Sequence, residues 1–171
     1  MKFKVVSKQH NTDMCFICGM NNNTGTKAEF YNCIDPDGNP CLVTKITPRE
    51  EHQSYPGRMH GGIISALLDE AVGRAVQHTN PEIWGVTIDL AVKFRKPVPL
   101  DKTVWIVSRV TNLGLRSFDA TGEMFTEYGT TLASVTAKYF KLSQDQVFNG
   151  DKLNDKNWFI VPEKLPKYFE L

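Results

Sequence analysis

The sequence has no long apolar run and no strong charge of either sign. None of its apolar stretches approaches the roughly 18 residues that a membrane-spanning helix needs, and the first residues, MKFKVVSKQHNTDM, lack the apolar core of a secretory signal. The net charge is +1 over 171 residues, so no strong field draws the chain to nucleic acid or to a membrane surface. We therefore expect a cytoplasmic protein that has neither a nucleic acid nor a membrane as its partner.

The chain has one CxxC motif, Cys15-Phe16-Ile17-Cys18, and no second CxxC or HxxxH motif to match it. A structural zinc site needs four ligands, and only Cys33, Cys41 and His60 could complete one here. A redox CxxC would need a thioredoxin-like βαβ setting, which the sequence does not indicate. Without a secretory signal, we interpret all four cysteines as reduced thiols, two of them in an N-terminal cover, and expect no metal. Zinc at the CxxC is the alternative.

The composition is that of an ordinary soluble globular protein, with 41% hydrophobic and 23% charged residues. The length fits one domain with a sizeable core. We divide the chain into an N-terminal cover segment over residues 1–26, a main domain over residues 27–142 and a C-terminal tail over residues 143–171. Residues 1–26 are predicted to be irregular. In the tail, the stretch DKLNDKN is predicted to be loose, and WFIVPEKLPKYFEL is predicted to pack on the domain through its aromatic residues.

The main domain has the hydrophobic pattern of two strands, one helix and four further strands. The helix begins at HGG and ends near His78, before Asn80 and Pro81. The spacing of the strands, with short turns between them, favours antiparallel neighbours. The order ββαββββ predicts an α+β fold in which the sheet wraps around one long central helix. The strands are predicted at residues 27–35, 41–47, 84–98, 103–112, 116–127 and 130–142.

The helix HGGIISALLDEAVGRAV carries two acids on different faces. At about 100° per residue, Glu70 falls with Arg74 and Gln77 on the side opposite the apolar face, so we expect Glu70 to face water. The predicted buried face consists of Ile64, Leu68, Ala71, Val72 and Ala75.

Asp69 lies on a flank of the helix that otherwise carries Ser65, Ala66, Gly73 and Val76. Small residues let another backbone come close, so we interpret this flank as a contact with a partner subunit or a ligand, with Ser65 as a candidate ligand contact. An aspartate placed there would be partly removed from water, a setting that suits a general base. The alternative is a structural aspartate, hydrogen-bonded to Ser65 or to a neighbouring loop.

The start of the helix is a second candidate site. Gly61 and Gly62 leave backbone N–H groups unhindered at the positive end of the helix dipole, where they could polarise a carbonyl or stabilise an oxyanion. The alternative is that both glycines only permit a tight turn. His60 is a candidate base, and the alternative is a hydrogen-bonded loop residue.

These motifs together resemble the hotdog-fold acyl-CoA thioesterases of the PaaI-like type. The resemblance rests on His60-Gly61-Gly62 followed nine residues after the histidine by Asp69, within the strand order above. The preceding Tyr55-Pro56-Gly57-Arg58-Met59 resembles the loop before that motif, and Cys15-Phe16-Ile17-Cys18-Gly19 resembles the N-terminal segment of one branch of the family. The resemblance covers about residues 14–142 and does not extend over the tail.

The resemblance implies hydrolysis of an acyl-CoA thioester at sites shared by two subunits of a homodimer or homotetramer. In the family pattern, the Gly61 N–H of one subunit would polarise the thioester carbonyl, and Asp69 of the other would be the general base or the nucleophile. Thr87 matches a Ser/Thr position that orients the water. Ser54 stands where the family commonly has an asparagine. No cofactor is expected, because coenzyme A arrives as part of the substrate.

Four cations are candidates for binding the phosphates of coenzyme A, although a charge run usually faces water: Lys93, Arg95, Lys96 and Arg116. Two other functions remain open. A hotdog enoyl-CoA hydratase or dehydratase typically pairs a histidine with an acid, and no Asp-x-x-x-x-His pair of that kind occurs near the helix. The other open function is a non-catalytic acyl-CoA binding module. A DNA-binding regulator of this kind would need a helix-turn-helix motif before the domain, and residues 1–26 are too few to form one.

Overall fold

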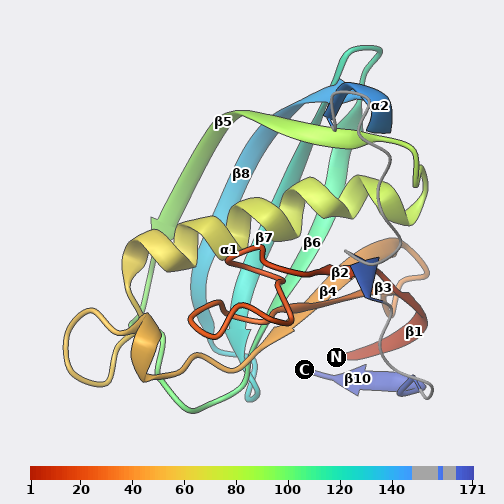
Figure 1. The fold of residues 1–171 in the computed structure, drawn as a ribbon. Coiled ribbons are helices and arrows are strands. Elements are labelled where there is room, and N and C mark those ends of the chain that lie inside the picture. Colours follow the sequence, from red (N-terminus) through yellow and green to blue (C-terminus); the bar gives the residue numbers. More distant parts are fainter. Residues whose placement is uncertain (148–157, 160–164) are drawn as a thin grey trace.

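The computed structural model describes residues 1–147, 158–159 and 165–171. One antiparallel sheet in the strand order β10-β1-β3-β4-β6-β7-β8-β5 curls around the helix α1, Gly61–Arg74 (Figure 1). The hotdog fold predicted from the sequence is therefore confirmed. The strands of this sheet are β1 Lys2–Lys8, β3 Glu29–Ile34, β4 Pro40–Ile46, β5 Trp84–Phe94, β6 Val104–Leu113, β7 Ser117–Thr126, β8 Thr131–Leu142 and β10 Tyr168–Glu170.

Several short elements complete the described chain. A two-stranded sheet joins β2, Asn11–Thr12, to β9, Trp158–Phe159. The helix α1 continues as a 3-10 turn, η2, over Ala75–His78, so that helical structure ends at the predicted residue. The remaining elements are η1, Glu50–His52, and α2, Gln144–Val147. Within the described ranges, no helix has the length and apolar character needed to cross a membrane.

The main core lies between α1 and the concave face of the sheet. All five residues of the predicted apolar helix face are buried, and Leu67 joins them. Strands β3 and β4 alternate between two faces: Phe30 and Leu42 belong to this core, whereas Tyr31 and Val43 belong to a second cluster on the outer face. The single helix is therefore covered by the sheet, as its broad apolar face requires.

The second cluster explains a part of the fold that the sequence analysis missed. Residues 1–26 were expected to be irregular, but β1 adds a seven-residue strand to the sheet. Phe3 of β1 is buried in the outer cluster, and Phe169 of β10 packs on Tyr31 and Trp105 with ring centroids 4.9 Å away in each case. Because β1 pairs with β10, the two chain ends lie side by side (Figure 1). The stretch DKLNDKN lies outside the described residues.

Strand β5 forms the other edge of the sheet. It pairs with β8 on one side, and its register shifts between Thr87 and Asp89, which leaves Ile88 as an extra residue. It ends at Phe94, four residues before the end predicted from the sequence. Val86, Ile88 and Phe94 are each about half exposed. A long edge strand with exposed apolar side chains is a ready site for pairing with another chain.

Candidate active site

The beginning of α1 is arranged as a helix cap. His60 is the N-cap residue in an extended conformation, and its Nδ1 accepts a hydrogen bond of 2.9 Å from the Gly62 N–H. Its own backbone N–H donates to the carbonyl of His52 at 2.8 Å. As the first helical residue, Gly61 has no intrahelical acceptor for its N–H. Gly61 is thus the residue of HGG whose N–H is left for a ligand, while His60 serves as the cap.

Asp69 is half-buried and is held by two hydroxyl donors. Thr87 donates to Asp69 Oδ1 at 2.9 Å, and Tyr139 donates to the same oxygen at 2.8 Å and to the Asp69 backbone carbonyl at 2.8 Å. Both side-chain contacts use Oδ1, so Oδ2 is left to contact water or substrate. Ser65, the partner considered from the sequence, instead donates to the carbonyl of Gly61 at 3.0 Å.

The two donors reach Asp69 because they are direct partners across two strands. Thr87 of β5 stands opposite Tyr139 of β8, so both side chains project toward α1 on the same face of the sheet. Gly73 makes room for the tyrosine, since a Cβ there would lie 3.0 Å from Tyr139 Cε1. The ring of Phe118 stacks on the tyrosine ring, with the two centroids 4.9 Å apart. The small flank of the helix therefore receives a strand residue of the same chain.

Tyr139 was not identified from the sequence. It lies 70 residues after Asp69, and only the inward alternation of residues 131–142 marks it as facing the helix. Burial, followed by the nearby Asp69 carboxylate, raises the pKa of the Tyr139 hydroxyl, so the phenol remains a hydrogen-bond donor to the carboxylate. The tyrosine hydroxyl thus stays protonated and orients the Asp69 carboxylate by donating a hydrogen bond to it.

We expect Tyr139→Phe to lower stability and to weaken the positioning of Asp69. A hydrogen bond to a charged group contributes about 1.5–3 kcal/mol, which corresponds to a fall in Tm of roughly 3–12 °C for a domain of this size. Thermal unfolding at neutral pH would measure it. Tyr128→Phe is the matched control, because Tyr128 is exposed on a turn and its loss should leave Tm unchanged. Equal Tm values for the two variants would contradict the role given to Tyr139.

Two separate cavities hold the two halves of the candidate site. The cavity at Asp69, about 260 Å³, is lined by Thr87, Tyr139, Gly73 and Trp84, among others. The cavity at Gly61, about 310 Å³, lies at the other end of the helix. Eight residues separate Asp69 from Gly61, a rise of about 12 Å along an α-helix. A single thioester carbonyl cannot contact both groups of one chain.

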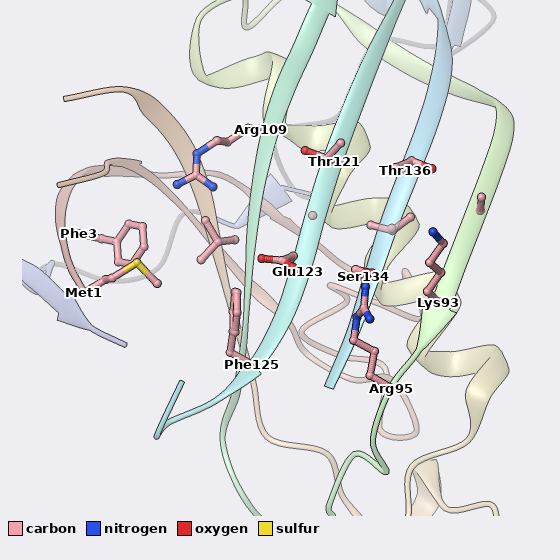
Figure 2. A pocket seen from close by; sticks show the side chains of 14 residues that line it. Met1, Phe3, Lys93, Arg95, Arg109, Thr121, Glu123, Phe125, Ser134 and Thr136 are labelled. Atoms are coloured by element: carbon pink, nitrogen blue, oxygen red, sulfur yellow. Dashed lines mark hydrogen bonds between the residues drawn. The ribbon is translucent and has the colours of Figure 1, made fainter. Parts of the chain in front are cut away.

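The predicted cations divide between different surfaces. Ser54, Arg95 and Lys96 line the Gly61 cavity. Lys93 lies on the outer side of the sheet. There it lines a cavity of about 440 Å³ together with Arg95, which thus borders both cavities (Figure 2). Arg116 lies near the opposite end of β5, because its carbonyl accepts from the N–H of Lys141, which pairs with Gly85.

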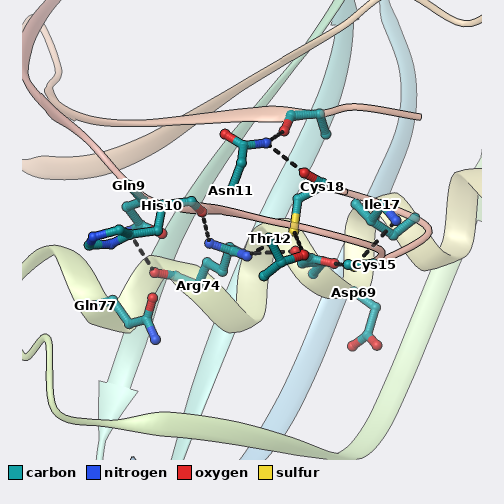
Figure 3. A network of polar contacts seen from close by, with 12 residues as sticks. Gln9, His10, Asn11, Thr12, Cys15, Ile17, Cys18, Asp69, Arg74 and Gln77 are labelled. Atoms are coloured by element: carbon teal, nitrogen blue, oxygen red, sulfur yellow. Dashed lines mark hydrogen bonds and ion pairs between the residues drawn. The ribbon is translucent and has the colours of Figure 1, made fainter. Parts of the chain in front are cut away.

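The predicted solvent face of α1 is covered instead, so the expectation that Glu70 faces water is wrong. The side chains of Glu70 and Arg74 are 20% and 13% exposed, and they form an ion pair at 2.9 Å. Residues 10–18 lie over them (Figure 3), and Arg74 donates to the carbonyl of His10 at 3.0 Å. Helix periodicity identified the side opposite the main core, but it could not reveal that another segment packs there.

The CxxC motif belongs to this covering segment. Sulfur atoms of Cys15 and Cys18 and a carboxylate oxygen of Glu70 lie within 4.8 Å of one another, which makes them the candidate metal ligands of the described residues. The completions considered from the sequence are elsewhere: Cys33 and Cys41 lie in the outer-face cluster, and His60 caps the helix. Within the described ranges no fourth protein ligand completes a tetrahedral site.

Comparison with known proteins finds similarity to thioesterases. Residues 56–133 match the model of the Thioesterase superfamily. The human acyl-coenzyme A thioesterase 13 is 26% identical over 73 residues, which are 43% of this chain and 52% of that protein. This chain thus spans about half the length of that curated relative.

Two solved structures share the fold. Protein RHA08564, a thioesterase superfamily protein, has a TM-score of 0.64 at 22% identity, over 73% of this chain and 62% of that one. The Escherichia coli PaaI protein from the phenylacetic acid degradation operon has a TM-score of 0.56 at 18% identity, over 60% and 73% of the two chains. The chain therefore has the hotdog fold, and its residues 56–133 are similar to the thioesterase superfamily, in agreement with the resemblance to the PaaI-like proteins.

Proposed function

We propose that this protein hydrolyses acyl-CoA thioesters to a free acid and coenzyme A. The observation that carries the proposal is the state of Asp69: its Oδ1 is fixed by Thr87 and Tyr139 beside a cavity, and its Oδ2 is uncommitted. A carboxylate fixed at one oxygen and free at the other suits a general base or a nucleophile. The match to acyl-coenzyme A thioesterase 13 supports coenzyme A as the thiol half of the substrate.

The active site would be completed by a second copy of the chain. Because Gly61 and Asp69 of one chain are about 12 Å apart along the helix, an antiparallel partner helix is needed to place a Gly61 N–H near Asp69. The open edge of β5, with its exposed Val86 and Ile88, supports a homodimer in which two β5 strands extend one sheet. Two such dimers could associate further as a tetramer.

In this arrangement the reaction needs no cofactor. With Asp69 as the base, a water molecule oriented by Thr87 gives its proton to Oδ2 and attacks the thioester carbon. The Gly61 N–H and the positive end of α1 stabilise the oxyanion, a contribution on the order of 3 kcal/mol. The C–S bond then breaks, and the leaving thiolate recovers the proton. With Asp69 as the nucleophile, an acyl anhydride forms first and water hydrolyses it.

The cations near Gly61 would bind the phosphate groups of coenzyme A. Arg95 and Lys96 line the Gly61 cavity together with Ser54, so this end of the site has the positive charge that the substrate needs. Lys93 and Arg116 would contribute where the dimer brings their surfaces nearby. Thiol release from acyl-CoA substrates, followed over a panel from acetyl to long-chain and aryl thioesters, tests the proposal. Hydration of an enoyl-CoA without thiol release would favour the hydratase, and binding without turnover would favour the binding module.

We expect that positive charges introduced at the β5 edge both separate the subunits and abolish activity. The double variant Val86→Lys/Ile88→Lys places like charges on both strands of the proposed junction, where they would repel one another. Light scattering at micromolar concentration should change from dimer or tetramer to monomer, and thiol release should be lost. Leu115→Lys is the control, because Leu115 is 93% exposed in the β6–β7 turn. A parent protein that is active as a stable monomer would contradict the shared site.

A further inference from the structure

The pair Cys15 and Cys18 packs against α1 at Glu70 and Arg74, and the side chain of Asp69 points away from it (Figure 3). Cys18 is fully buried, and its Sγ accepts a hydrogen bond of 3.2 Å from Arg74 Nη2 and lies 3.3 Å from Thr12 Oγ1. Cys15 is partly exposed, and its Sγ lies 3.4 Å from Glu70 Oε2. The two sulfurs therefore differ in accessibility: Cys15 can react with a reagent from solution, and Cys18 is buried next to it.

The backbone between the two cysteines is already shaped for a disulfide. Residues 15–19 form a closed turn in which the Gly19 N–H donates to the Cys15 carbonyl at 2.7 Å. Gly19 is required there, since a Cβ would lie 2.3 Å from that carbonyl oxygen. The first and last residues of a four-residue turn have Cα atoms within about 7 Å, the range that a disulfide needs. The sulfurs, within 4.8 Å of each other, can close to a bond by side-chain rotation.

The environment favours a dithiol over a metal site. Arg74 Nη2 donates to Cys18, and Arg74 Nε pairs with Glu70 Oε1 at 2.9 Å, so a guanidinium already contacts two of the three candidate ligands. A metal ion would have to displace this cation from both of them. The Ile17 N–H, which donates to Cys15 Sγ at 3.4 Å, further stabilises charge on the exposed sulfur.

The thiols also differ in reactivity. A hydrogen bond from Cys18 lowers the pKa of Cys15 to about 6, against burial and the Glu70 carboxylate, which act in the opposite direction. The same coupling and burial raise the pKa of Cys18. Burial raises the pKa of Cys33 to about 12 and that of Cys41 to about 11. Cys15, which is also the one of the four that is not buried, is therefore the most readily ionised, and thiolates are the reactive form.

We propose that Cys15 and Cys18 form a redox-active dithiol, a modification site that hydroperoxides oxidise to an intramolecular disulfide. The Cys15 thiolate attacks the peroxide, the O–O bond breaks, and a sulfenic acid forms as water or an alcohol leaves. The Cys18 sulfur then displaces the hydroxyl of the sulfenic acid, which leaves as water with the Cys18 proton. Two thiols and one hydroperoxide thus give one disulfide, one alcohol or water, and one further water.

Oxidation changes how the N-terminal segment is attached to the catalytic helix. The disulfide removes the Cys15 thiol that contacts Glu70, the residue next to Asp69, and changes the sulfur that accepts the hydrogen bond from Arg74. The proposal does not depend on the proposed thioesterase activity, because its products are read from the protein itself. It gives the CxxC motif a redox role outside the thioredoxin-like βαβ setting that the sequence analysis required, a role that neither zinc binding nor simple burial provides.

The experiment treats the 171-residue chain with equimolar hydrogen peroxide at pH 7 and follows it by intact mass and peptide mapping. We expect loss of two hydrogens, a Cys15–Cys18 disulfide, and full reversal by dithiothreitol. Cys18→Ala should stop at a sulfenic acid that dimedone traps on Cys15, and its alkylation midpoint should move upward from about pH 6, because the hydrogen bond from Cys18 is lost. The double variant Cys33→Ser/Cys41→Ser is the matched control and should oxidise like the parent.

Three results would overturn the proposal. One is four free thiols after peroxide treatment of the parent protein. Another is alkylation of Cys15 no faster than that of Cys33 and Cys41, which are also neighbours across β3 and β4 but are buried. The third is stoichiometric zinc in the purified protein that protects Cys15 and Cys18 from the reagent.

Discussion

Asp69→Asn is expected to lower thiol release from acyl-CoA substrates by roughly 10²–10⁴-fold, the contribution of a positioned general base. The amide cannot take a proton from water and is a poor nucleophile. Its Oδ1 can still accept the hydrogen bonds that Thr87 and Tyr139 donate to the carboxylate. The fold and the oligomer should therefore persist, and the loss should appear in kcat more than in KM.

The neighbouring acid supplies the control for this substitution. Glu70→Gln changes the adjacent residue of the same helix, which lines the same cavity but whose carboxylate is paired with Arg74. Free-thiol detection with both variants, alongside light scattering, separates catalysis from folding. An Asp69→Asn protein as active as the parent would show that Asp69 is a structural residue, hydrogen-bonded by two strands and without a role in the reaction.

Gly61→Pro is expected to lower kcat by about 10²–10³-fold while leaving the helix in place. Proline is favoured at the first helical position, because it lacks only an N–H that has no intrahelical acceptor. The residue before a proline must be extended, and His60 already is, with φ −66° and ψ 133°. The substitution thus removes the proposed oxyanion donor and little else, and the expected loss is that of one such donor.

Gly61→Ala is the matched control, because it adds a side chain and keeps the N–H. Its Cβ would lie 3.7 Å from the Phe94 ring, an ordinary van der Waals contact. Circular dichroism and Tm should be similar for both variants, and steady-state kinetics should separate them. Equal losses for alanine and proline would mean that Gly61 is needed for space around the helix start, and the N–H would then have no catalytic role.

Mixing the two inactive variants tests whether the site is shared. In a heterodimer of Asp69→Asn with Gly61→Pro, one of the two sites combines an intact Asp69 with an intact Gly61 from the other chain. After random reassociation, half of the dimers are heterodimers, so about a quarter of the parental activity should return. No recovery after verified subunit exchange would contradict the assignment of these two groups to different subunits.

The sequence predicted the main fold because each element has a local signal. The period of 3.6 residues identified the buried face of α1, and alternation with short turns identified β3 to β8. The same reasoning failed for β1, although its seven residues alternate in the observed strand, because its partners lie far away in sequence. A strand that forms by pairing β1 with β10, at opposite ends of the chain, has no short-range signature.

The candidate site was predictable to a similar extent. Gly61, Asp69 and Thr87 follow from a spaced motif and its family resemblance, and the structure brings Thr87 to Asp69 at 2.9 Å. Tyr139 could not be found in this way, because its contact with Asp69 depends on the register of β8 against β5. The cover over Glu70 and Arg74 was missed for the same reason, since it depends on how residues 10–18 fold back onto α1.

By itself, the sequence determined that one apolar helix is wrapped by an antiparallel sheet, that a bare N–H group opens this helix and that an aspartate lies on its flank. These features follow from periodicity and local conformation, which neighbouring residues control. Tertiary structure alone decided which oxygen of Asp69 remains free, that the two halves of the proposed site lie in separate cavities, and that Cys15 and Cys18 meet Glu70 and Arg74. Each of these depends on contacts between segments that are distant in sequence, and such contacts are specified only when the whole core packs.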